Sequence, residues 1–115
     1  MKVLADTNVL LAFLDRKADF ASAIKETYLQ IEFFVFKQSL DEIKAKRPAA
    51  VEPVDWYLRK NGFRILPGKG KADELILKWA VENNAMVATR DFGLKKRLKK
   101  AGIQVISLKN NKLVY

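Results

Sequence analysis

The chain has 115 residues, of which half are hydrophobic and 30% are charged, and its formal net charge is +9. This length suits one domain spanning residues 1–115 with a sizeable core, and it is too short for two. The chain contains no cysteine and no histidine, which excludes disulfides, thiolate catalysis, a zinc ribbon and an imidazole base. Any catalysis would therefore have to use carboxylates, hydroxyls, lysines or a hard cation such as Mg²⁺ or Mn²⁺.

The charge and the apolar runs also bear on partners and location. No apolar run approaches the ~20 residues of a membrane span. The N-terminus enters a strand-like run at once, without the regions of a signal peptide, so we expect a cytoplasmic protein with no membrane partner. The basic balance suits a polyanion such as RNA. It is also found in small proteins that bind no particular partner, so charge alone does not decide between these interpretations.

Strand-like runs alternate with helical patterns along the chain. Strands are expected near residues 2–6, 33–37, 63–66, 86–89 and 103–108, and helices near 8–14, 18–31, 38–46, 49–61, 71–84 and 92–101. Residues 110–115 are expected to form a short edge strand or a loose tail. The alternation predicts an α/β fold, a three-layer α/β/α sandwich around a central parallel sheet of four to five strands.

Four acidic residues come where a predicted strand gives way to a helix: Asp6, Glu42, Asp73 and Asp91. In a parallel sheet of order 3-2-1-4-5, the carboxyl ends of strands one and four meet where the strand order reverses, and Asp6 and Asp91 flank this point. Four carboxylates at one place repel one another unless a divalent cation binds there. The pattern therefore predicts a site for Mg²⁺ or Mn²⁺. Polar side chains expected to support the acids directly or through water are Thr7, Asn8 and Thr89.

Each acid also has a possible structural role at a helix start. Asp6 and Asp91 are suitable N-caps. Glu42 completes a Ser39-x-x-Glu42 capping box, and Asp73 lies in a first helical turn, where the helix dipole favours a carboxylate. Both interpretations stay open for each acid taken singly, whereas the joint pattern favours the metal site.

The four motifs resemble those of the PIN-domain ribonucleases, in the same order and over nearly the whole chain. The motifs are Asp6-Thr7-Asn8, Glu42-Ile43, Ala72-Asp73-Glu74-Leu75-Ile76 and Ala88-Thr89-Arg90-Asp91. Residues 65–98 look most like the PIN nucleases of the small-subunit processome, which take part in pre-ribosomal RNA cleavage, and suggest an archaeal-type counterpart. The resemblance implies an endoribonuclease dependent on Mg²⁺ or Mn²⁺ that cleaves single-stranded or loop RNA. Carried over by position, its catalytic and metal-binding residues are Asp6, Glu42, Asp73 and Asp91.

The chain departs from the family pattern at two positions. Gly93 stands where many members have a further acid, and Glu74 replaces the second Asp of the processome proteins. These departures leave the number of metal ions open between one and two. Asp6 and Asp91 are expected to be direct ligands, with Glu42 and Asp73 binding metal directly, through water, or orienting the nucleophile.

Basic residues near these motifs are candidates for contacts with RNA phosphates. Several lie on the last predicted helix, and the others lie beside the fourth acid or in a Gly/Lys turn: Lys95, Lys96, Lys99, Lys100, Arg90, Lys69 and Lys71. Cations in the later turns of a helix are also favoured by its dipole, so a solvated basic face is the alternative. Trp56 and Tyr57 are candidates for stacking on bases.

Two other functions remain open. One is a toxin-type PIN ribonuclease, which would have an antitoxin as its partner. The other is a non-catalytic RNA-binding scaffold, which the complete set of four repelling acids argues against. A homodimer is compatible with each of these functions.

Overall fold

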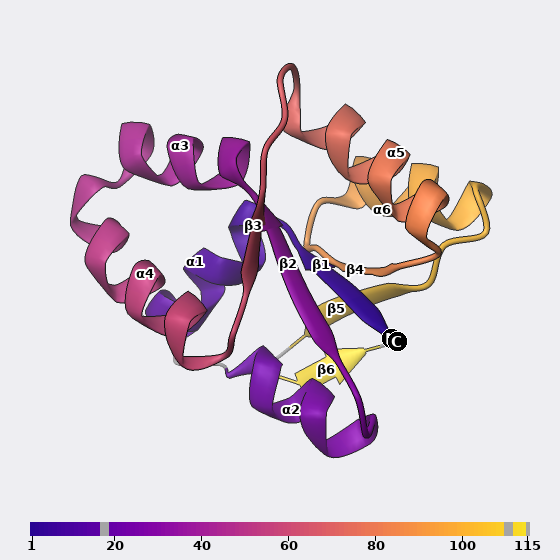
Figure 1. Ribbon diagram of the computed structural model, residues 1–115, viewed down its shortest axis with the longest axis horizontal. Helices are drawn as coiled ribbons and strands as arrows, with labels where there is room; N and C mark the ends of the chain where they lie inside the picture. The colour runs from indigo at the N-terminus through magenta and orange to yellow at the C-terminus, as the bar shows by residue number, and fades with distance from the viewer. Residues whose placement is uncertain (17–18, 110–111, 115) are drawn as a thin grey trace.

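The computed structural model describes residues 1–16, 19–109 and 112–114. Its sheet has the order β3-β2-β1-β4-β5-β6 (Figure 1). The strands are β1 (Lys2–Ala5), β2 (Glu32–Phe36), β3 (Arg64–Leu66), β4 (Met86–Ala88), β5 (Val105–Lys109) and β6 (Lys112–Val114). The first five are parallel, which confirms the predicted order 3-2-1-4-5, and β6 pairs antiparallel with β5. Residues 112–114 therefore form the edge strand that was one of two expectations for this segment, whereas residues 110, 111 and 115 lie outside the described chain.

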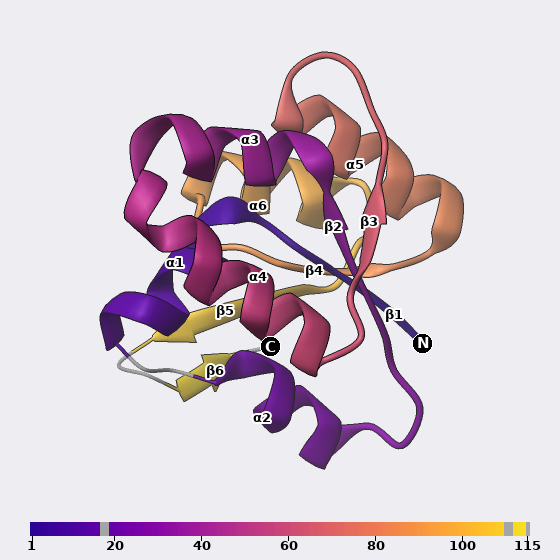
Figure 2. The same ribbon diagram turned by 60° about the vertical axis from the view of Figure 1, so that its left-hand side comes forward.

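Helices cover both faces of the sheet (Figure 2). One face carries α1 (Thr7–Arg16), α2 (Phe20–Thr27), α3 (Lys37–Lys46) and α4 (Val51–Lys60), and the other carries α5 (Ala72–Asn83) and α6 (Phe92–Lys100). Side chains alternate along each strand: Val3 and Ala5 of β1 join the core under α1–α4, and Leu4 joins the core under α5 and α6. The three-layer α/β/α prediction is confirmed. Among the described residues, no helix is long and apolar enough to cross a membrane.

Two helical segments differ from the expected bounds. α2 covers only residues 20–27 of the predicted 18–31, and the Asp19 side chain caps its start by accepting a hydrogen bond from the Ser22 amide at 3.2 Å. The predicted helix 49–61 begins with a 3₁₀ turn, η1 (Pro48–Ala50), and continues as α4. Pro48 and Pro53 occupy first turns, where a missing amide proton costs no helical hydrogen bond. These prolines therefore help to start helices rather than break them.

Candidate active site

The ends of the two central strands bring Asp6 and Asp91 to the same edge of the sheet. Asp6 follows β1, and its amide donates to the Ala88 carbonyl of β4 at 2.9 Å. The fully buried Thr89 hydroxyl donates to Asp6 Oδ2 at 2.8 Å and accepts from the Asp91 amide at 3.1 Å. One hydroxyl thus links both acids at the point where the strand order reverses, the usual location of ligand sites in open α/β sheets.

Glu42 reaches the same edge from α3. Its Oε2 accepts a hydrogen bond from the Thr7 hydroxyl at 3.2 Å. The capping-box interpretation is wrong, because α3 begins at Lys37 directly after β2 and Ser39 already lies inside the first turn. The Ser39 hydroxyl is fully buried and has no hydrogen-bond partner among the described residues. Glu42 therefore faces the start of α1 rather than the start of its own helix.

Electrostatic coupling joins Asp73 to the other three acids. Asp73 lies in the first turn of α5, and its pKa is raised first by burial and then by the charges of Asp91 and Glu42. The pKa of Asp6 is raised mainly by burial, with further contributions from Asp73 and Glu42. Carboxylates shift one another in this way only when they lie close together. All four acids consequently belong to one electrostatic group, the acidic cluster.

The acidic cluster has the chemistry that a hard divalent cation requires. Its donors are carboxylate oxygens, which Mg²⁺ and Mn²⁺ prefer, and a cation would offset the repulsion that raises the pKa of Asp73. Within residues 1–16, 19–109 and 112–114, however, no group of three or more acidic side chains is already arranged to hold one ion. Ligation by several acids would therefore require these side chains to turn toward one another.

One carboxylate oxygen of each central aspartate accepts a hydrogen bond from a backbone amide, and for Asp91 this bond is a helix cap. Asp91 is the N-cap of α6, because its Oδ1 accepts from the Leu94 amide at 3.0 Å. Asp6 Oδ1 accepts from the Thr7 amide at 2.8 Å. Asp6 Oδ2 accepts hydrogen bonds from the Thr89 hydroxyl and, at 3.4 Å, from the side-chain amide of Asn8. For Asp91, no described residue donates to Oδ2. A capping role and a ligand role are therefore compatible in the same side chain.

An open groove of about 720 Å³ lies against the acidic cluster. Glu42 and Asp73 line it, together with the basic residues Lys71 and Arg97. The guanidinium of Arg97 binds both carboxylate oxygens of Glu74, at 2.8 and 3.0 Å, and lowers the pKa of that carboxyl. Glu74 is thereby paired with a cation, and the charge of Arg97 also partly offsets the raised pKa of Asp73.

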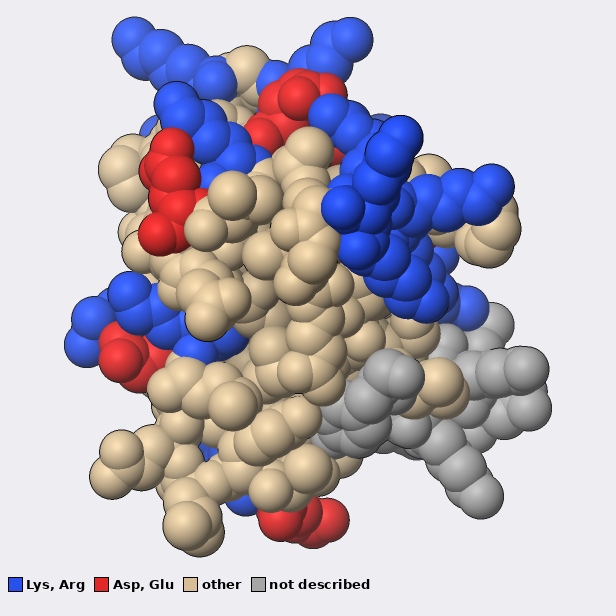
Figure 3. Space-filling model, turned by 90° about the vertical axis from the view of Figure 1, so that its right-hand side faces the viewer, with Lys and Arg blue, Asp and Glu red and all other residues tan. Residues whose placement is uncertain are grey.

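The basic residues predicted to contact RNA start at this edge of the sheet and continue along α6 toward the amino end of β5. α6 carries the four lysines Lys95, Lys96, Lys99 and Lys100, and the loop before α5 carries Lys69 and Lys71. In the view of Figure 3, acidic side chains lie at the top of the molecule with basic side chains around them, and a band of Lys and Arg lies below. The amide of Arg90 donates to the Asn8 side chain at 2.9 Å, which joins the β4–α6 connection to α1. The roles of these basic residues in binding RNA stay predictions.

Two side chains, Arg97 and Tyr57, take places that the sequence patterns did not indicate. Arg97 lines the groove and contacts α5, a pairing across 23 positions that depends on how α5 and α6 pack. Tyr57 cannot stack on a base, because it is buried and its hydroxyl donates to Asp19 at 2.8 Å while accepting from the Ala21 amide at 3.0 Å. The helical spacing of the apolar residues of α4 (Val54, Tyr57 and Leu58) was the signal that would have found this burial.

Replacing Thr89 by Val should impair the site and the fold together. The Asp91 amide and the buried Asp6 carboxylate would each lose a partner, and a buried group left without one typically costs about 1–3 kcal/mol of folding free energy. Partners that orient metal ligands are worth about 10- to 100-fold in activity or metal affinity, so a similar loss of RNA cleavage is expected. Urea unfolding measures the loss of stability, and cleavage rates measure the loss of activity. Thr89→Ser keeps the hydroxyl and should match the parent in both measurements. Thr27→Val, at an exposed position on α2, is the control. Parental cleavage by Thr89→Val would contradict this role.

The sequence was compared with models of known protein families. Residues 3–111 match the model described as "PIN like domain". The chain belongs to this family. No curated protein sequence gives a significant match.

Several solved structures share this architecture. The PIN domain endonuclease Utp24 superposes with a TM-score of 0.80 at 25% sequence identity, over 97% of this chain and 88% of that chain. VapBC2 from Rickettsia felis, bound to a DNA fragment from its promoter, superposes with a TM-score of 0.70 at 14% sequence identity, over 95% of this chain and 100% of that chain. VapBC-1 from nontypeable Haemophilus influenzae superposes with a TM-score of 0.66 at 12% sequence identity, over 91% of this chain and 96% of that chain. At these lower identities the two VapBC structures support the fold alone.

Proposed function

We propose that this PIN-like protein is a divalent-metal-dependent endoribonuclease that cleaves single-stranded or loop RNA. The observation that carries the proposal is the acidic cluster, four coupled carboxylates at the point where strand order reverses. Structural acids are usually paired or exposed, whereas Asp6 is only 6% exposed and its pKa is raised. An ionised carboxylate held in this way weakens the fold, so a ligand that needs its charge explains it best.

The four acids of the cluster would have different roles in hydrolysis. Asp6 and Asp91 would hold the cation, with Thr89 orienting both. When bound, a divalent cation supplies Lewis-acid activation of water and of phosphoryl oxygens. Glu42 and Asp73, which line the groove, would complete the ligand set or orient the attacking water. Since the chain has no histidine, a carboxylate is the group available to accept a proton.

The likeness to Utp24 and the motifs of residues 65–98 support a role in ribosomal RNA processing. Utp24 is an endonuclease, and this chain matches nearly all of its own length to that structure. The toxin-type PIN ribonuclease expected as an alternative from the sequence gains no support from the VapBC structures, which share the fold alone. Precursor ribosomal RNA is therefore the substrate class that we propose.

Cleavage of defined RNAs by the purified protein tests the proposed function. A single strand, a stem–loop and a blunt duplex, end-labelled, are incubated with Mn²⁺, with Mg²⁺, or with a chelator. We expect internal cuts in the single strand and the loop with either metal and none with the chelator. Cleavage that persists with the chelator, or its absence with every metal, would contradict the proposal.

A further inference from the structure

An aromatic side chain stands exposed directly beside the acidic cluster. Phe92 follows Asp91 as the first residue of α6 and is 70% exposed. Single exposed apolar residues are common, so exposure alone carries no conclusion. The position of this ring, next to an acid of the proposed active site, is what separates it from other exposed side chains.

The neighbours of Phe92 along α6 are cations. The Lys96 ammonium lies 4.7 Å from the centre of the Phe92 ring, in a cation–π contact. Residues four apart on a helix share one side, so Phe92, Lys96 and Lys100 form a row that starts beside Asp91 and runs along α6. The same side of α6 thus presents one aromatic ring and then a series of positive charges.

Successive groups of this kind match the chemistry of an unpaired nucleic-acid strand. Bases of a single strand stack on exposed aromatic rings, and the connecting phosphates bind cations. A duplex buries the faces of its bases against their neighbours, so it can offer its phosphates to the lysines but no base to the ring.

We propose that Phe92 is a stacking platform for an unpaired base of the RNA, next to the phosphate that is cut at the acidic cluster, and that Lys96 binds the adjoining phosphate. This inference rests on the proposed function and names the side chain that would give it a preference for unpaired RNA. Phe92 selects the strand state without reading the base, because every base has a π-face.

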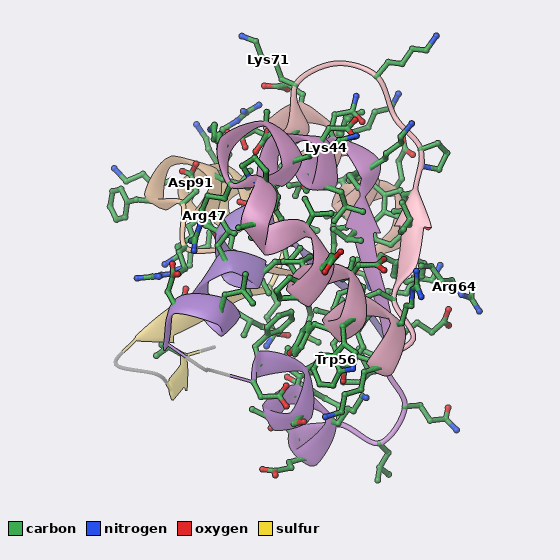
Figure 4. All side chains as sticks on the ribbon, turned by 90° about the vertical axis from the view of Figure 1, so that its left-hand side faces the viewer. Lys44, Arg47, Trp56, Arg64, Lys71 and Asp91 are labelled. Carbon is green, nitrogen blue, oxygen red and sulfur yellow. The ribbon has the colours of Figure 1, made fainter. Side chains whose placement is uncertain are left out.

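The chain contains a matched control for this proposal. Trp56 is also exposed, at 56%, and carries Lys60, four residues on, at 4.9 Å from its ring centre. Trp56 lies on α4, which leads into the amino end of β3, the opposite edge of the sheet from the acidic cluster. Figure 4 shows it well separated from Asp91. An exposed ring with a lysine four residues on therefore lies beside the cluster in α6 and away from it in α4. The distant position of Trp56 argues against its predicted stacking on bases at the site.

The test compares binding of three RNA ligands by wild type, Phe92→Ala and Trp56→Ala, with Ca²⁺ present to slow cleavage. The ligands are a labelled uridine oligomer, an abasic oligomer of equal length, and a blunt RNA duplex. Loss of one stacked base should weaken binding of the uridine oligomer by Phe92→Ala about 5- to 150-fold. Binding of the other two ligands, and all binding by Trp56→Ala, should match wild type. Phe92→Trp should bind the oligomer like wild type, whereas Phe92→Leu should resemble Phe92→Ala.

Three results would overturn the inference: no loss in Phe92→Ala, an equal loss for all three ligands, or a greater loss in Trp56→Ala. Cleavage by the wild type with Mn²⁺ is measured separately. If the wild type cleaves RNA but Phe92→Ala binds normally, the stacking proposal fails and the proposed function stands. If ring-dependent binding occurs without any cleavage, the proposed function fails and the stacking proposal stands.

Discussion

Replacing Asp6 by Asn is expected to abolish metal-dependent RNA cleavage and to leave the metal-free protein at least as stable as the parent. Asp6 is buried, and its pKa is raised by that burial and by Asp73 and Glu42. A neutral amide removes the buried charge and can still accept the Thr7 amide hydrogen bond. Partners of metal ligands are worth about 10- to 100-fold, so the loss of a ligand itself should exceed this range. Cleavage with Mn²⁺ and urea unfolding with a chelator measure the two effects.

Asp55→Asn is the control for this substitution. Asp55 forms an exposed ion pair with Arg59 of the same helix at 2.8 Å, and such pairs contribute little to stability. Its loss should leave cleavage unchanged. A stability loss of ~1 kcal/mol in Asp6→Asn with unchanged metal affinity would instead support a purely structural cap.

The pH dependence of stability separates Asp6 from the acids that stabilise the fold. A carboxyl whose folded pKa is raised binds its proton more tightly when folded, so its contribution to stability increases as pH falls through the folded pKa toward 3.8. Asp19 has a lowered pKa, so its contribution is lost only as pH falls below 3.8. With a chelator present, the stability advantage of Asp6→Asn over wild type should therefore shrink on acidification from neutral pH. A constant difference would contradict a raised pKa.

Replacing the four lysines of α6 by Gln should weaken RNA binding without slowing cleavage of bound RNA. The residues changed are Lys95, Lys96, Lys99 and Lys100. Each lost phosphate contact to a single strand lowers the slope of log K against log salt by ~0.7. Lysines on one helix cannot all reach phosphates, so we expect a loss of roughly two contacts and a slope change of about 1.4. RNA affinity across a salt series with Ca²⁺ measures the slope, and cleavage at saturating RNA with Mn²⁺ measures the chemistry.

A control of equal charge tests whether position matters. Four cations near the opposite edge of the sheet are replaced by Gln: Lys25, Arg59, Lys60 and Arg64. General attraction between the basic protein and RNA would be weakened equally in both variants. A direct contact predicts a larger change of slope in the α6 variant. Equal slopes would show that α6 is a solvated basic face and that RNA follows another path, for instance along Lys69, Lys71 and Arg90.

Most of the fold follows from periodicity. Apolar runs separated by helical patterns predicted a parallel sheet of four to five strands, because strands buried on both faces are continuously apolar. The order 3-2-1-4-5 was expected from the resemblance to PIN domains. The errors have local causes. α2 ends at Thr27, four residues before the expected end, and the role of Ser39 was misassigned because β2 passes into α3 without a turn. A helix that starts directly after a strand has no separate capping segment for a sequence pattern to reveal.

Part of the site could be predicted from the sequence because Asp6 and Asp91 closely follow the ends of β1 and β4, which a parallel sheet brings to one edge. Contacts between helices could not be predicted from the sequence. The pairing of Arg97 with Glu74 depends on the packing of α6 against α5, and the burial of Tyr57 depends on the orientation of α4. Phe92 follows Asp91 in the sequence, but only the structure separates its exposed ring from the buried Leu94 and Leu98 of the same helix.

Mn²⁺ binding tests most directly whether the acidic cluster is a metal site. The titration, followed by electron paramagnetic resonance of free Mn²⁺, compares wild type with Asp6→Asn, Asp91→Asn and Glu82→Gln. Glu82 is an exposed acid near the end of α5, away from the cluster. We predict that wild type and Glu82→Gln bind Mn²⁺ equally and that each cluster variant binds at least about tenfold more weakly. Equal binding by all four proteins, or no binding by the wild type, would contradict the account.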